Sequence, residues 1–191
     1  MNRIRSLVLL SLGAMLLSSC TLIPTAHDPI IIKRGPGQFG LLGKTIPGTN
    51  SRVQFITQRV YIVDATGHLT PSSRIVPSPP TLDSVLGELI LGPTDIETSA
   101  GFTSALPKRL VILQATVKNG IGFVALTSPL SDLPHAREVL AIGQLVLTAR
   151  DVGATNGLEV LVAGVAQSLL KPSGKKSRHV YARDYQSLLN A

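Results

Sequence analysis

The segment from Thr81 to Pro93 constrains the fold most, because its pattern predicts a short helix that needs a partner surface. Its apolar residues recur at the spacing that lines one side of an α-helix, and they are Leu82, Val85, Leu86, Leu89 and Ile90. Thr81 suits an N-cap, and Gly92-Pro93 is a stop signal. Since so short a helix is unstable alone in water, we expect it to pack on the alternating segments 60–64 and 110–126.

The region on either side of this helix predicts two strands and a second short helix. Val53, Phe55 and the run 60–64 read as a first strand, which is closed by a turn at 65–68. Residues 69–76 read as a short, interrupted partner strand. After the first helix, residues 93–97 predict a helical start with acidic residues in its first turn, ending near Gly101.

A β-hairpin is predicted next. Residues 110–118 alternate, with one side formed by Val111, Leu113, Ala115 and Val117 and the other by Gln114, Thr116 and Lys118. Asn119-Gly120 is typical of a two-residue turn, because both central residues of a type I′ turn need positive φ. Residues 121–126 would form the returning strand.

The segment after Pro134 predicts a longer, mostly buried helix from His135 to about Val152. Its polar positions form one narrow stripe, and they are Arg137, Gln144, Thr148 and Asp151. Asn156-Gly157 then turns the chain into a last strand at 158–165.

The order of elements is β-α-β-β-α-β, and it predicts an α+β fold in which two main helices cover one face of a mostly antiparallel sheet. The chain has 191 residues, with 44% apolar and 15% charged, which suits one globular domain. The core must be aliphatic, because the chain holds four Phe, three Tyr and no Trp.

The N-terminus predicts export and a lipid anchor. Arg3 and Arg5 precede an apolar run, 7–17, which is too short to span a bilayer and reads as a secretory signal. Leu-Ser-Ser-Cys, ending at Cys20, resembles the bacterial lipobox, which implies a diacylglyceryl group on the Cys20 thiol and cleavage before it. The alternative is an ordinary signal peptide with an incidental cysteine.

We therefore expect a signal peptide at 1–19, a lipid-anchored linker rich in Pro and Gly at 20–52, and a domain at 53–191 on the extracytoplasmic face of the membrane. The linker contains the pattern G-x-G-x-x-G at 35–40, but Pro36 within it and the absence of a following helix argue against a dinucleotide site. We expect no cofactor.

The sequence contains no recognisable catalytic arrangement, so we expect no enzyme. The four histidines are far apart along the chain, namely His27, His68, His135 and His179, and no G-x-S-x-G motif occurs. Asp64 and Asp184 could act as acid and base, but Asp64 is expected to end a strand and Asp184 to cap a helix or pair with Arg183. A single cysteine excludes an internal disulfide and a thiolate zinc site, and we expect no other metal site.

The order of several short motifs resembles the GerMN domain of spore-germination and sporulation proteins. These motifs are 60–64 with Gly67, Val76-Pro77, 89–94, Gly101, 105–107 and 144–146. The likeness is closer to actinobacterial GerMN lipoproteins, which share the lipobox and motifs like those at 23–25, 39–42, 183–185 and 188–189.

The resemblance implies a non-enzymatic, extracytoplasmic domain related to ring-building modules of envelope or sporulation assemblies. One departure concerns the end of the second hairpin strand. Many relatives carry an acidic residue and a serine there, whereas this chain has Ala125-Leu126-Thr127. A polar role for that position is therefore not expected here.

Two functions remain open. The first is a protein-interaction module whose sheet face or edge contacts an envelope protein, with homo-oligomers as one form of assembly. The alternative is a binder of anionic wall glycan or lipid head groups through a basic loop, with Lys171, Lys175, Lys176 and Arg178 as contacts. This cluster lacks interleaved aromatic residues, so nucleic acid is not an expected partner.

Overall fold

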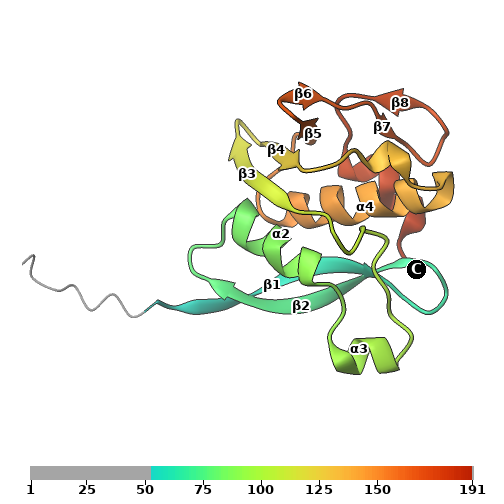
Figure 1. The fold of residues 1–191 in the computed structure, drawn as a ribbon. Helices are drawn as coiled ribbons and strands as arrows, with labels where there is room; N and C mark the ends of the chain where they lie inside the picture. Colours follow the sequence, from blue (N-terminus) through green and yellow to red (C-terminus); the bar gives the residue numbers. More distant parts are fainter. Residues whose placement is uncertain (1–52, 191) are drawn as a thin grey trace, which may run out of the picture. The chain divides into compact units, whose positions relative to one another are not determined.

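The structure is a computed structural model and describes residues 53–190. The elements in this range are β1 (Phe55–Val63), β2 (Leu69–Pro77), α2 (Leu82–Leu91), α3 (Asp95–Ser99), β3 (Ile112–Lys118), β4 (Ile121–Leu126), the 3₁₀ helix η1 (Leu130–Asp132), α4 (His135–Asp151), β5 (Leu158–Val162), β6 (Val165–Ala166), β7 (Leu169–Leu170), β8 (Lys176–Ser177) and the 3₁₀ helix η2 (Ala182–Leu188) (Figure 1). This mixed arrangement with mainly antiparallel pairing confirms the predicted α+β class.

The strands β1 and β2 form an antiparallel hairpin that pairs along its whole length. The predicted turn is present, and the backbone N–H of Asp64 donates to the carbonyl of His68 at 2.8 Å. The prediction of a short, interrupted partner strand is wrong, because β2 is continuous. Pro71 is tolerated opposite Tyr61 because the Tyr61 N–H points away from β2, toward Thr148, so this pair needs no ladder hydrogen bond.

The helix α2 begins and ends where the sequence predicts. Thr81 is the N-cap and accepts from the Ser84 N–H at 3.1 Å, while Ser84 Oγ accepts from the Thr81 N–H at 3.1 Å. Gly92 is the C-cap. The buried side of α2 packs on β1, β2 and β3, so both flanking segments serve as its partner. The second short helix is also confirmed as α3, with Thr94 as its N-cap.

The predicted β3–β4 hairpin is present, with φ of 52° at Asn119 and 77° at Gly120. The expected sidedness of its first half is wrong. A shift in register between Ile112 and Gln114 turns Leu113 outward, where it is 64% exposed, and lets Ile112 pack against the core.

The last predicted strand is divided. β5 ends at Val162, and a turn at Ala163 and Gly164, both with positive φ, leads into β6. β5 pairs with β4 in parallel, because the crossover through α4 returns the chain in the same direction. The sheet order is β3-β4-β5-β6, and β1-β2 and β7-β8 form separate two-stranded sheets, in place of the single sheet expected.

The helix α4 has the predicted bounds and lies at the centre of the core, where residues 141–149 are all buried. Two residues of its polar stripe, Gln144 and Thr148, are also buried, and they lie against the edge of β1, whereas Arg137 is exposed. Thr148 Oγ1 accepts from the Tyr61 N–H at 3.1 Å, and Gln144 Nε2 donates to the Tyr61 carbonyl at 2.8 Å. These side chains take the place of a third strand beside β1, which explains why the sheet does not continue there.

None of the helices within residues 53–190 combines the length and the apolar character needed to cross a bilayer.

Candidate interaction surface

The strand β4 is apolar on both faces. Its sequence is Ile121-Gly122-Phe123-Val124-Ala125-Leu126. The buried positions, Gly122, Val124 and Leu126, face the core, where Gly122 lies against Leu82 and Leu158. The other three are only half-buried. Because a sheet with one solvated face usually carries polar residues on it, β4 has the sequence of a strand covered on both sides.

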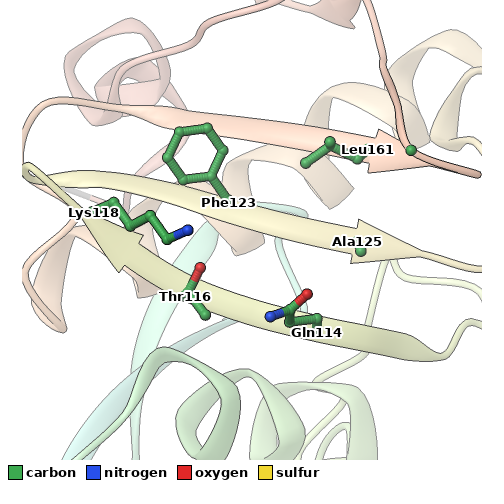
Figure 2. Close-up of a pocket in the computed structure, with 7 residues that line it drawn as sticks. Gln114, Thr116, Lys118, Phe123, Ala125 and Leu161 are labelled. Carbon is green, nitrogen blue, oxygen red and sulfur yellow. The ribbon is translucent and has the colours of Figure 1, made fainter.

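The outer side of β4 forms the floor of a shallow hollow of about 340 Å³, which we call the outer hollow (Figure 2). Its lining residues come from three neighbouring strands and the turn after β5, and they are Gln114, Thr116, Lys118, Phe123, Ala125, Leu161 and Gly164. Apolar side chains of β4 and β5 form its floor, and the polar side chains of β3 form one wall. The outer hollow therefore offers an apolar contact with a polar border.

Strand register brings these residues together. Thr116 pairs with Phe123 across β3 and β4, and Ala125 pairs with Leu161 across β4 and β5. Figure 2 shows Lys118 on the same side of β3 as Thr116, with its ammonium directed along the sheet toward Thr116. Lys118 is the charged residue of the lining and is exposed.

In the basic loop proposed from the sequence, one cation forms an ion pair and three are exposed. Lys171 Nζ lies 2.9 Å from Asp184 Oδ2, and the side chains of Lys175, Lys176 and Arg178 are exposed. Burial alone would raise the pKa of Asp184, but the Lys171 ammonium and the Tyr181 N–H together outweigh burial, and the pKa is lowered. The structure therefore does not group all four predicted contacts into one free cationic site.

Asp184 also caps η2, because its Oδ2 accepts from the Tyr181 N–H at 3.2 Å. The capping role considered from the sequence is correct, whereas the ion pair is formed with Lys171 and not with Arg183.

Asp64 follows the end of β1, as expected, and its carboxylate organises the β1–β2 turn. Its Oδ1 accepts from Thr66 Oγ1 at 2.6 Å and from the His68 N–H at 3.0 Å, and its Oδ2 accepts from Asn190 Nδ2 at 3.1 Å. The Thr66 hydroxyl is the main cause of a pKa well below the usual range. A carboxylate held in this way is a structural acceptor rather than a general base.

Other proposed residues lie apart or outside the described part. Cys20, residues 1–52 and the glycine pattern at 35–40 lie outside the described residues. His68 lies in the β1–β2 turn, His135 begins α4, and His179 Nδ1 lies 3.2 Å from Glu159 Oε1. Within residues 53–190, no three His, Cys, Asp or Glu side chains are grouped so as to hold a metal ion.

The alternation in the sequence predicts Gln114, Thr116 and Lys118 on one side of a strand, and the structure confirms this, because all three line the outer hollow. The same alternation does not identify Phe123 or Leu161. The available signal was the absence of polar residues from β4, which is unusual for a strand with one solvated face.

Comparison with known proteins gives a family and a fold. The family model Germane, described as sporulation and spore germination, matches residues 59–168. No curated protein sequence matches the chain significantly.

Two solved structures from Bacillus subtilis have a similar fold. The tandem GerMN domains of the sporulation protein GerM match with a TM-score of 0.53 and 13% identity, over 69% of this chain and 48% of that chain. This chain thus spans about half the length of the tandem structure. The first GerMN domain alone matches with a TM-score of 0.51 and 14% identity, over 67% of this chain and 98% of that chain. Since the family model covers more than half of the sequence, the chain belongs to the Germane family of GerMN-domain proteins.

Proposed function

We propose that this protein is a lipid-anchored, extracytoplasmic lipoprotein whose GerMN domain acts as a non-catalytic protein-interaction module in the cell envelope. The interaction role rests on the outer side of β4. Its residues Ile121, Phe123 and Ala125 are apolar, and no helix within residues 53–190 covers them (Figure 1). An uncovered apolar strand of this kind is stabilised when a partner excludes water from it.

The proposed process is spore formation or germination. Support comes from the family description and from Bacillus subtilis GerM, which is a sporulation protein. The proposed anchor is supported by the apolar run at 7–17 followed by Leu-Ser-Ser-Cys at Cys20. The linker at 20–52 would hold the domain away from the membrane surface.

A non-catalytic role is supported by the way the partly buried carboxylates are used. Glu97 pairs with Arg74 at 2.7 Å, Asp151 pairs with Arg59 at 3.1 Å and Asp184 pairs with Lys171. Each connects two separate segments of the chain, which is a structural use of its charge. None of these residues lines the outer hollow.

The experiment that tests the interaction role is site-specific photo-crosslinking in membranes of cells that make the full-length protein. A photoreactive phenylalanine analogue at Phe123 should yield one discrete crosslinked envelope protein. The matched control is Ile96, which is 83% exposed on α3, and the same analogue there should not yield that product. Identical products from both positions, or none from Phe123, would contradict the proposal.

The alternative function, binding of anionic glycan or lipid head groups, is supported by the exposed cations Lys175, Lys176 and Arg178. Raising the salt concentration separates the two functions. A contact made by exposed cations weakens steeply with ionic strength, whereas an apolar protein contact does not. Salt-resistant retention of the crosslinked partner would favour the protein-interaction role.

A further inference from the structure

We infer that the outer hollow binds a polypeptide segment in which an acidic side chain lies next to an apolar one. This inference rests on the proposed function, since it names the chemistry of the partner at the same surface. It is carried by the apolar floor, by the exposed cation Lys118, which forms no ion pair within residues 53–190, and by the row of polar groups along β3.

The floor of the outer hollow requires an apolar group on the partner. Phe123, Ala125 and Leu161 are half-buried, and each lies on the side of the sheet away from the core. Figure 2 shows the Phe123 ring and the Leu161 side chain on the same side of the sheet. Covering this floor with an aliphatic or aromatic side chain removes apolar surface from water on both partners.

Lys118 favours an acidic group on the partner. Among residues 53–190, the ion pairs involve other cations, and Lys118 forms none of them. Lys171 differs, because Asp184 already neutralises it. The Lys118 ammonium is directed toward Thr116 and thus toward the apolar floor (Figure 2). A carboxylate that pairs with it therefore lies beside the group that covers Phe123.

The row along β3 favours an extended polypeptide. Gln114, Thr116 and Lys118 occupy alternate positions of one strand, so neighbouring side chains are roughly 7 Å apart. An extended peptide that runs along β3 repeats with the same period and meets an amide, a hydroxyl and an ammonium in turn.

A polyanionic glycan fits this surface less well. Its repeated charges need several cations, and the outer hollow has one beside an apolar floor. The exposed group formed by Lys175, Lys176 and Arg178 is a better match for a polyanion. The acidic peptide is therefore the partner class that the lining favours.

The test is selection from a random heptapeptide phage library on the full-length protein, immobilised in detergent. We expect enrichment of peptides with Asp or Glu adjacent to an aliphatic or aromatic residue. Enrichment of basic or uncharged peptides, or no enrichment, would overturn the inference. Binding to the polyanion polygalacturonate would overturn it too, if that binding is lost in Lys118→Glu and no peptide is enriched.

Three variants locate the binding. Lys118→Glu should lower the affinity for an enriched acidic peptide by roughly 3- to 10-fold at low salt, because attraction becomes repulsion. The same variant should select basic peptides from the library instead. Phe123→Ser should abolish enrichment, with circular dichroism showing that the fold is retained. Lys175→Glu, an exposed charge reversal outside the outer hollow, should change neither result. An equal loss in Lys118→Glu and Lys175→Glu would overturn the inference.

The two proposals fail in different ways. If the Phe123 position crosslinks an envelope protein and Lys118→Glu leaves that product unchanged, the interaction role stands and the acidic-peptide inference is wrong. If no envelope protein is crosslinked, the interaction role itself is wrong.

Discussion

Gln144 uses both ends of its buried amide to connect three segments of the chain. Its Nε2 donates to the Tyr61 carbonyl at 2.8 Å and its Oε1 accepts from the Ala105 N–H at 2.8 Å. The side chain is fully buried. Because water does not reach this place, each backbone group depends on Gln144 for its hydrogen bond.

We expect Gln144→Leu to lower the free energy of unfolding by roughly 2–4 kcal/mol, because two buried backbone groups lose their partners. Urea denaturation of the two proteins measures the difference. Gln186→Leu, at an exposed position of η2, is the control and should change stability by less than about 0.5 kcal/mol. Equal effects of the two substitutions would show that the amide does not have this role.

Arg74 and Glu97 form a largely buried ion pair that attaches α3 to β2. Arg74 Nη2 donates to Glu97 Oε2 at 2.7 Å, the side chains are 8% and 18% exposed, and the Ser72 hydroxyl also donates to Glu97. Burial alone would raise the pKa of Glu97. The hydrogen bonds from Arg74 and Ser72 outweigh it and lower the pKa to about 2.

The lowered pKa predicts loss of stability in acid. The pair stabilises the fold fully above the ordinary Glu pKa of 4.5, and this contribution is lost as the pH falls toward about 2. We expect Glu97→Gln to cost about 1–3 kcal/mol at neutral pH and to flatten the acid limb of the stability curve. Thermal unfolding across this pH range measures both. The control Glu88→Gln on α2 should leave the loss of stability in acid unchanged. If the wild-type protein loses no stability as the pH falls from 4.5 toward about 2, the role assigned to the Arg74–Glu97 pair is wrong.

At the scale of elements, the best predicted parts are those specified by neighbouring residues. The bounds of α2 follow from Thr81, Gly92 and the apolar spacing between them. The β3–β4 turn follows from Asn119-Gly120. The prediction was wrong for Leu113, because β3 has one extra residue there in its pairing with β4, and this irregularity decides which side Leu113 faces.

The helix α2 contains a glycine that its position does not require. Gly87 is exposed, and a Cβ added there would meet no atom within 4 Å beyond its chain neighbours and the backbone of its own helix. We expect Gly87→Ala to stabilise the protein by about 0.5–1 kcal/mol, since alanine favours the helix more than glycine does. A rise in melting temperature would show this.

Gly157 is the contrasting control. Its φ is +115°, and an added Cβ would lie 2.8 Å from the Val180 carbonyl oxygen, so Gly157→Ala should destabilise the protein. If Gly87→Ala lowers the melting temperature as much as Gly157→Ala does, then α2 does require a glycine at position 87.

For the whole molecule, the proposed anchor makes a prediction about location. Cys20→Ala removes the thiol that the lipobox-like sequence would present for acylation. We expect this variant to leave the membrane fraction and to lose labelling by a radioactive or clickable fatty acid, because the anchor depends on the acyl chains. Cell fractionation checks the outcome, with wild type as reference. Continued lipid labelling of Cys20→Ala would contradict the anchor.

The sequence by itself determined the elements whose signals are local, namely α2, the β3–β4 hairpin and α4, and with them the α+β class. Only the tertiary structure decided which polar residues are buried and which apolar residues are left open. Gln144 and Thr148 are buried because the edge of β1 supplies their hydrogen-bond partners. Phe123 and Leu161 form one surface because β5 returns beside β4 after α4, and such neighbours cannot be identified from residues adjacent in the chain.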